Sequence, residues 1–329
     1  MIQTDINYEL ELLAVSWMLE DDDEYIEEYV EEPQNSPSLL EHLLSQCSAM
    51  NSINSKFETL DRIRESLDNN AILVSYLRRN ALYEFYRMIL DYAESHLSFD
   101  SLSNNPDDIT FFTNRYQLTS MMCNRGLSGY NEINSKLTSL AEIGLIKSLT
   151  DSEIRPDVLH RAYEIVNNAS DSRNQIMNRA NFYVLYDLTE EVVSTAVQRI
   201  ELFRELGIRR RGRTAESIAI VLGEDIVNNN INVQANVSIN KTKVTNFINA
   251  ATLLLNQYGY FTENELRKQY SRKDHHTKKK DAIKLTKIYL PKVILECQLT
   301  RVRVNKYYRN KFSIPNKIKN NSYIFIRKI

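Results

Sequence analysis

Glycine and proline are scarce in this 329-residue chain, which contains seven Gly and six Pro. Sandwiches and barrels need many tight turns that these residues supply, so their scarcity favours helices and predicts a mainly α fold. Neither of the glycine-rich loops that cradle nucleotide phosphates is present, so we do not expect ATP hydrolysis. The chain also lacks any run of about 18 apolar residues, and we expect no membrane partner.

Cysteine is also rare. Cys47, Cys123 and Cys297 are odd in number and far apart, without the Cys-x-x-Cys spacing of zinc and redox sites. We therefore expect free thiols in a reducing compartment. Residues 1–8 do not begin a secretion signal, which makes a cytoplasmic location the default expectation.

Candidate catalytic or metal-binding groups are equally few. His275 and His276 are the only adjacent histidines, and neighbouring residues on a helix point apart, so a solvated turn is expected there. The acidic run at residues 20–32 favours an interaction surface that also shields the basic end of the chain, because one-sided charge blocks are usually solvated faces or interaction tails. The sequence predicts no metal, no cofactor and no enzymatic activity.

The formal net charge of −2 is a sum of opposites. Residues 1–60 carry 14 acidic residues and one basic residue, whereas residues 261–329 carry 19 basic and five acidic residues. Clustered Lys and Arg displace the counterions of phosphates, so this asymmetry predicts a polyanionic partner such as nucleic acid. A solvated basic face without a partner is the alternative.

The middle of the chain shows the order helix, turn, helix, strand. Residues 116–123 and 130–143 have the apolar spacing of helices on either side of a turn. Gly144 is placed to end the second helix, and an extended run begins at Leu145. A short strand at residues 182–188 is expected to pair back with that run. Helices are also expected in these segments: 8–19, 20–32, 38–47, 57–67, 72–97, 156–169, 189–206 and 214–227.

The C-terminal part repeats this order as helix, helix, helix, hairpin. Thr262 and Glu265 form the Thr-x-x-Glu pattern of a capping box, and Pro291 is expected to kink or break the last helix. An Asn-rich segment, residues 228–240, is the best linker candidate before it. The expected elements are helices 243–257, 262–270 and 278–296, strands 299–304 and 323–326, and a basic loop 305–322.

Residues 118–146 resemble the winged helix-turn-helix superfamily, whose third helix typically ends in Leu-x-x-x-Gly-Leu-Ile. Here the ending is Leu140-Ala-Glu-Ile-Gly144-Leu145-Ile146, and the resemblance covers roughly a tenth of the chain directly. It implies that the third helix lies in the DNA major groove with its early outward residues at base edges. The long insertion between Ile146 and Phe182 departs from the pattern, so the resemblance does not define the wing. The residues carried over are Tyr130, Asn131, Asn134 and Ser135 for bases, and Arg125 and Lys136 for phosphates.

The second copy is the more basic of the two. Its third helix and its hairpin carry most of the positive charge, and Tyr307, Tyr308 and Phe312 interleave with these charges and offer stacking or sugar contacts. Contact with protein alone is the alternative for both copies, and it weighs more for the first. The candidate DNA contacts are Lys278, Lys279, Lys280, Lys284, Lys287, Arg301, Arg303, Lys306, Arg309 and Lys311.

Residues 188–255 show a fainter resemblance to a cyclin-type repeat of transcription factor IIB, based on residues 211–219 and 237–244 between amphipathic helices. The intervening segment is short for that fold, and no zinc ribbon precedes it. The alternative is a helical connector with a basic elbow that contacts phosphates. The elbow residues are Arg209, Arg210, Arg211 and Arg213.

The sequence therefore predicts a double-stranded DNA-binding regulator of transcription with tandem winged-helix domains. A plasmid or viral replication initiator that binds repeated sites is one alternative, and a protein-interaction scaffold is the other. The N-terminal helices are expected to mediate self-association or contact with a protein partner. The predicted division is an acidic helical region 1–68, a first winged-helix domain 69–188, a connector 189–240 and a basic winged-helix domain 241–329.

Overall fold

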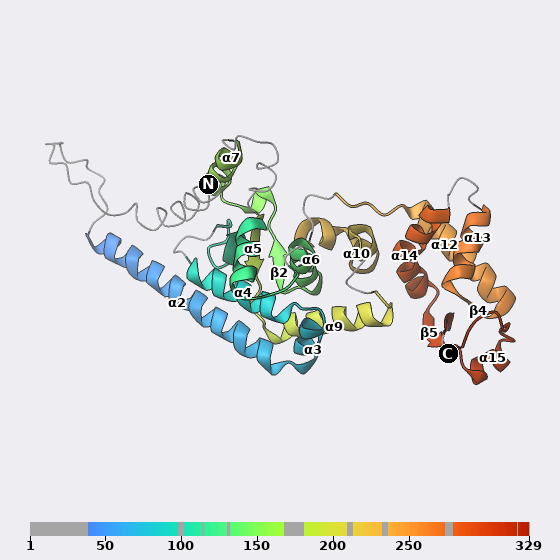
Figure 1. Ribbon diagram of the computed structural model, residues 1–329. Helices are drawn as coiled ribbons and strands as arrows, with labels where there is room; N and C mark the ends of the chain where they lie inside the picture. The colour runs from blue at the N-terminus through green and yellow to red at the C-terminus, as the bar shows by residue number, and fades with distance from the viewer. Residues whose placement is uncertain are drawn as a thin grey trace.

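In the part of the chain that the structure describes, the fold is mainly helical, as predicted, with two small antiparallel sheets of three strands each (Figure 1). Predictions for residues 8–32 and for His275 and His276 lie outside the part of the chain that the structure describes. This computed structural model describes residues 39–97, 102–113, 115–129, 132–167, 181–208, 213–231, 236–273, 279–320 and 322–328.

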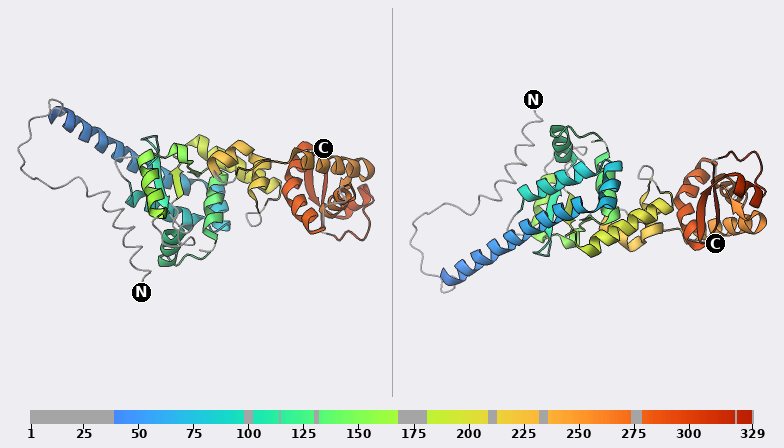
Figure 2. Two further views of the ribbon diagram at one scale, coloured as in Figure 1. Left: turned by 90° about the horizontal axis from the view of Figure 1, so that it is seen from above. Right: turned by 90° about the horizontal axis from the view of Figure 1, so that it is seen from below.

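The described part of the chain begins with α2 (Leu39–Asn69), one continuous helix whose N-terminal part extends away from the other described elements (Figure 2). Its C-terminal part packs in the buried core through Leu60, Ile63 and Leu67. The helix predicted at residues 72–97 is instead two helices, α3 (Ala71–Arg79) and α4 (Tyr83–Ser95). The prediction was wrong because the break depends on one residue in a left-handed conformation, Ala81 with φ 53°. Apolar spacing continues across such a break, so the pattern alone does not reveal it.

Residues 83–185, here called the first unit, form α4, β1 (Ile109–Thr113), α5 (Arg115–Asn124), α6 (Ile133–Ile143), β2 (Ile146–Ser148), η2 (Asp151–Glu153), α7 (Pro156–Asn167) and β3 (Asn181–Leu185). The strand order is β1-β3-β2, and the predicted antiparallel pairing of β2 with β3 is confirmed. The strand β1 was missed, although its sequence Ile-Thr-Phe-Phe-Thr is rich in β-branched and aromatic residues.

Residues 241–328, here called the second unit, repeat this order without a helical turn corresponding to η2. The strand order β4-β6-β5 matches that of the first sheet, and the predicted C-terminal hairpin is confirmed as β5 paired with β6. The elements are α12 (Lys241–Tyr258), β4 (Tyr260–Phe261), α13 (Glu263–Lys273), α14 (Lys279–Glu296), β5 (Leu299–Arg303), α15 (Lys306–Lys311) and β6 (Tyr323–Arg327).

The structure corrects two expectations for the second unit, the break of its last helix at Pro291 and the loop at residues 305–322. Helix α14 continues through Pro291, which is buried together with its neighbours Leu290 and Val293. Their burial outweighs the loss of one backbone hydrogen bond at the proline. The segment expected as a basic loop contains the short helix α15, whose start is capped by Asn305.

Both sheets are covered on both faces. Along β3, Tyr183 and Leu185 pack in the large first core, whereas Phe182 and Val184 pack in a smaller cluster with Val158 of α7. The second unit repeats this division, with Phe325 of β6 in the helical core and Ile324 and Ile326 in a cluster with Ile314. In each unit the chain between the second and third strands therefore returns over the outer face of the sheet.

The two units are joined by α9 (Glu190–Glu205), α10 (Ala215–Leu222), α11 (Glu224–Ile226) and the π-helical turn η3 (Val227–Ile231). The helix predicted at residues 214–227 stops at Gly223, whose φ of 104° does not continue a helix. The Asn-rich linker begins as η3, because Val227 and Ile231 are buried in the first core. This core runs from Leu60 to Ile231, across the boundaries predicted at residues 68 and 188.

Helix α10 contributes to both cores. Ile218 and Ala219 belong to the buried cluster of the first unit, whereas Ile220 belongs to that of the second unit and α10 packs against α14. Helix α12 lies in the second core. Among the described residues, the segment 188–255 that resembles a cyclin-type repeat is therefore divided between two cores.

The buried hydroxyl of Tyr86 leads to the first testable prediction. It is buried and has no hydrogen-bond partner among the described residues, and burial raises the pKa of this side chain. Tyr86→Phe should therefore leave stability unchanged or raise the free energy of unfolding by about 1 kcal/mol, because an unpaired buried hydroxyl is costly. Urea denaturation followed by circular dichroism measures the change.

Tyr92 is the matched control on the same helix. Its hydroxyl donates a hydrogen bond to the Phe112 carbonyl at 3.1 Å, and burial raises its pKa to about 12. Tyr92→Phe should lower the free energy of unfolding by about 1 kcal/mol, since it leaves the carbonyl without this donor. Equal losses for the two variants would contradict the assignment of Tyr86.

Candidate nucleic-acid interface

The candidate recognition helix of the first unit, α6, is mostly buried. Helix α9 and the turn η3 pack against it, and Leu137, Leu140 and Ile143 lie in the first core. Among the predicted base-reading residues, Asn134 and Ser135 at its start are exposed, whereas Tyr130 and Asn131 lie outside the described residues. Only the first turn of α6 is thus open to a partner.

Lys136 does not lie where a phosphate could reach it. It is 2% exposed, and its Nζ donates a hydrogen bond to the Ser128 carbonyl at 3.1 Å. The same nitrogen lies 5.2 Å from the centroid of the Phe85 ring, a cation–π contact. The predicted phosphate contact is corrected to an internal role, in which Lys136 ties the turn before α6 to α4.

Arg213 is corrected in the same way. Its guanidinium forms an ion pair with Glu142 of α6, and the two side chains are only 6% and 3% exposed. The guanidinium carbon also lies 4.4 Å from the Phe203 ring centroid, so the charge is enclosed on several sides. Arg213 therefore anchors the connector to α6. The other elbow residues, Arg209, Arg210 and Arg211, lie outside the described residues.

Arg125 is the remaining cation predicted for the first unit. Its side chain is exposed but pairs with Asp91 at 2.8 Å. Asp91 also accepts a hydrogen bond from Arg64 at 3.2 Å, so the charge of Arg125 is partly balanced at the surface. The first unit offers polar groups at the start of α6 and little uncompensated positive charge there.

The second unit presents its charge differently. On α14, Ala282, Thr286 and Tyr289 are buried, while Lys284 and Lys287 are exposed. Tyr289 lies 5.6 Å from the Phe247 ring centroid, which fixes the inward side of the helix. Of the other predicted lysines, Lys279 and Lys280 begin α14 but their side chains are not among those described, and Lys278 lies outside the described residues.

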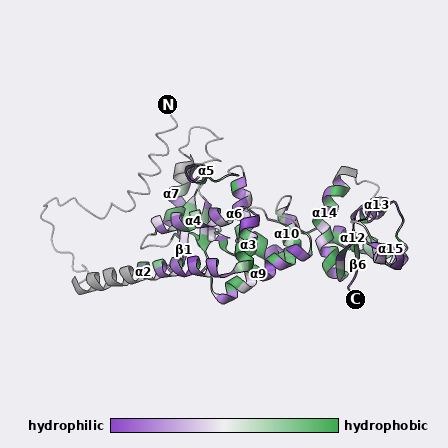
Figure 3. Cartoon of the chain, turned by 60° about the horizontal axis from the view of Figure 1, so that its bottom comes forward, coloured by the Kyte–Doolittle hydropathy of each residue, from purple (hydrophilic) through white to green (hydrophobic). Residues whose placement is uncertain are grey.

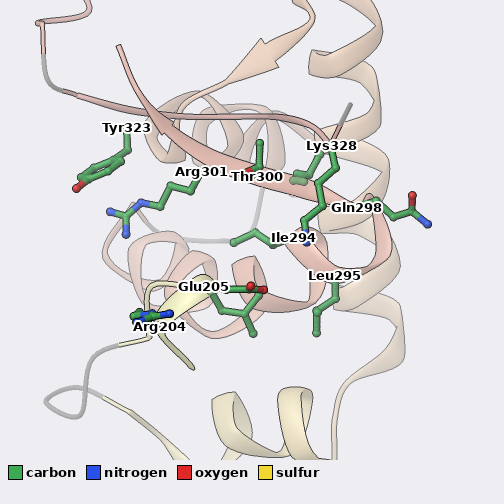
Figure 4. Close-up of a pocket in the computed structure, with 11 residues that line it drawn as sticks. Arg204, Glu205, Ile294, Leu295, Gln298, Thr300, Arg301, Tyr323 and Lys328 are labelled. Atoms are coloured by element: carbon green, nitrogen blue, oxygen red, sulfur yellow. The ribbon is translucent and has the colours of Figure 1, made fainter. Parts of the chain in front are cut away.

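The side of α14 that carries the two exposed lysines lines a cleft near the C-terminal end of the helix. Ile294 follows Lys287 by seven residues and Leu295 follows Lys284 by eleven, spacings that keep each pair on nearly the same side of a helix. Ile294 and Leu295 line a cleft of about 640 Å³ between α14, β5, β6 and the end of α9 (Figure 4). Its charged lining residues are Arg204, Glu205, Arg301 and Lys328.

Arg301 and Arg303 are positioned by Tyr323. Their guanidinium carbons lie 3.7 Å and 5.5 Å from its ring centroid, and the Arg303 Nε donates a hydrogen bond to the Tyr323 hydroxyl at 3.0 Å. Both arginines are exposed residues. A guanidinium held against a ring in this way can donate two hydrogen bonds to a phosphate.

Arg309 is a structural residue rather than a nucleic-acid contact. It donates hydrogen bonds to the carbonyls of Ile314, Pro315 and Ile318 at 3.1, 3.0 and 2.7 Å. These bonds hold the loop after α15 over the sheet. The neighbouring Lys306 and Lys311 are exposed on α15. The structure thus separates the basic residues of the hairpin into those beside α14 and those on α15.

A comparison of the chain with protein-family models, curated proteins and solved structures finds no match. Within the described ranges, no three His, Cys, Asp or Glu side chains gather as they would around a metal ion. None of the described helices offers an apolar stretch of the length that a membrane crossing requires. Cys123 and Cys297 are free thiols, as predicted for them.

Proposed function

We propose that this protein binds double-stranded DNA through the second unit and regulates transcription, with the two units as tandem winged helices. The recurrence of one element order and one strand order in both units supports this proposal. Both units follow the helix, helix, hairpin order that the resemblance to the superfamily implies. Their additional helices, α7 and α15, cover the outer faces of the sheets.

The observation that carries the proposal is the basic path of the second unit. It consists of Lys284 and Lys287, which are exposed on α14, and of Arg301 and Lys328, which line the cleft farther along this helix together with the acidic Glu205. Residues 299–329 contain nine Lys and Arg and no Asp or Glu, so the hairpin adds no opposing charge. A helix with exposed lysines beside a β-ribbon with exposed arginines suits the phosphates that flank a major groove.

The first unit has a different part in this proposal. Because the two charged residues of α6, Lys136 and Glu142, are buried, whereas Lys284 and Lys287 of α14 are exposed, we assign the first unit to holding the connector in place and to protein contacts. Helix α2, which extends from the body, is the proposed element for self-association or for a protein partner. The exposed start of α6 can still contact bases if DNA follows both units.

A plasmid or viral replication initiator is the second candidate, since the duplicated topology also suits binding to repeated sites. Footprinting of bound genomic fragments separates the two candidates. Direct repeats about one helical turn apart indicate the initiator, whereas a single palindrome at a promoter indicates the regulator. A protein that binds only other proteins would show no salt-dependent DNA binding.

The central test replaces both exposed lysines of α14. Lys284→Ala with Lys287→Ala should weaken binding to duplexes of any sequence and reduce the slope of log K against log salt by about 2, because each lost phosphate contact contributes about 0.9. Fluorescence anisotropy of a labelled duplex at several salt concentrations measures both quantities.

Lys292→Ala is the matched control. Lys292 lies on the same helix, but its Nζ pairs with Glu296 at 2.8 Å, so its charge is already compensated. This variant should leave the affinity and the salt slope nearly unchanged. An unchanged slope in the double variant, or the same loss in the control, would remove α14 from the proposed interface.

A further inference from the structure

The second unit carries another surface, which the duplex proposal does not use. It consists of the exposed residues Lys306, Tyr307 and Lys311 on α15 and Tyr258 at the end of α12, and we call it the α15 surface. Tyr307 and Tyr258 are 61% and 51% exposed, the highest values among the large hydrophobic side chains that the structure describes. Helix α15 lies at the end of the second unit farthest from α10 (Figures 1 and 3).

A row of aromatic rings connects the two exposed tyrosines. The centroid distances are 6.5 Å from Tyr258 to Tyr260, 6.0 Å from Tyr260 to Phe312, 6.4 Å from Phe312 to Tyr308 and 5.1 Å from Tyr308 to Tyr307. The inner rings pack in the cluster that covers the outer face of the sheet. The exposed rings at both ends are therefore supported from beneath.

Hydrogen bonds fix the start of α15 and the loop that follows it. The Asn305 side chain caps α15 by accepting a hydrogen bond from the Tyr308 backbone N–H at 3.0 Å. Arg309 ties the following loop to the helix through three carbonyls. Binding to such a preformed surface loses little conformational entropy on the protein side.

One lysine lies close to the exposed ring of Tyr307, and further lysines are exposed on α15 and in the loop after it. The Lys311 Nζ lies 5.7 Å from the Tyr307 and Phe312 ring centroids, and Lys306 is exposed beside Tyr307 in the sequence. Lys317 and Lys319 are exposed in the loop that follows. Burial and the negative charge of Glu265 raise the pKa of Tyr260 in the aromatic row. The Glu265 carboxylate accepts hydrogen bonds from the backbone N–H and the hydroxyl of Thr262 at 2.9 and 3.0 Å.

We propose that the α15 surface binds single-stranded nucleic acid, with Tyr307 stacking on an unpaired base and the lysines contacting the adjacent phosphates. Exposed aromatic rings beside cations are the usual platform for a single strand. A duplex does not suit this surface, because its bases are stacked on one another and present only their edges in the grooves. The surface is separate from the lysines of α14, so one unit holds paired and unpaired strands at different places.

The test uses the full chain and a labelled oligothymidine of about 15 nucleotides, a length that spans a typical single-strand site. Tyr307→Ala should weaken binding about tenfold, whereas Tyr307→Phe should retain most of the affinity because the ring remains. Lys306→Ala with Lys311→Ala should lower the affinity and the salt slope. Because Tyr307 is exposed, circular dichroism should show an unchanged fold for each variant.

Two further measurements separate this proposal from the duplex proposal. Lys284→Ala with Lys287→Ala should leave oligothymidine binding intact, and Tyr307→Ala should leave duplex binding intact. The emission of a Tyr307→Trp variant should be quenched by oligothymidine and not by inorganic phosphate. Equal oligothymidine affinity of the protein and Tyr307→Ala, no binding of oligothymidine at all, or equal losses from the α14 and α15 variants would each overturn the inference.

Discussion

Arg213→Ala should lower the free energy of unfolding by about 3–5 kcal/mol, the usual loss when one partner of a buried ion pair is removed. The change removes the cationic partner of the Glu142 carboxyl group in a site where that side chain is only 3% exposed. It also removes the cation from the Phe203 ring and the hydrogen bond to the Ile208 carbonyl. Urea denaturation with circular dichroism measures the loss.

The exposed pair between Arg62 and Asp187 provides the matched control. Its charged atoms lie 3.0 Å apart, but the side chains are 52% and 35% exposed. Arg62→Ala should therefore lower the free energy of unfolding by less than about 1 kcal/mol. The double variant Glu142→Leu with Arg213→Met should recover most of the stability lost in Arg213→Ala, because apolar residues of similar volume often replace a buried pair well. A small loss for Arg213→Ala would contradict the assignment of this pair as an anchor.

Phe247→Ala should have an effect of similar size on the second unit. Phe247 is fully buried, and its ring lies 4.0 Å from the Tyr270 centroid and 5.6 Å from the Tyr289 centroid. The substitution opens a cavity between α12, α13 and α14 and should lower the free energy of unfolding by about 3–5 kcal/mol. If the proposed function is correct, duplex affinity should fall with it, since the cavity loosens the support of α14.

Leu253→Ala on the same helix is the control for this substitution. Leu253 is 45% exposed, so its truncation should change stability by no more than about 0.5 kcal/mol. Thermal unfolding with near-ultraviolet circular dichroism reports the packing of the aromatic side chains directly. Equal effects of the two substitutions would mean that the three rings do not form the centre of this core.

Periodicity and capping residues predicted much of the fold. The pairing of β2 with β3, the hairpin of β5 and β6, and the end of α6 at Gly144 are confirmed. The capping box of Thr262 and Glu265 is confirmed by two hydrogen bonds of 3.2 and 2.9 Å. These features depend on residues close together in the sequence, where local conformational preferences decide the outcome.

The burial of charged residues was not predictable in the same way. Lys and Glu are residue types that are almost never fully buried unless they are paired, and the burial of Lys136 and Glu142 depends on partners from other parts of the chain. The partner of Glu142, Arg213, comes from another element 71 residues later in the chain. Arg309 was assigned to DNA for its charge, whereas the carbonyls that it binds become neighbours only when the loop folds over the sheet.

The dual role of α10 has a consequence for how the protein comes apart. One helix of eight residues supplies Ala219 to one core and Ile220 to the other, and Tyr289 of α14 donates a hydrogen bond to its Glu216. Unfolding of either core would remove packing contacts from the other core at α10. The two cores should therefore unfold in one cooperative transition, and a pulling force applied to one core should act on the other through α10.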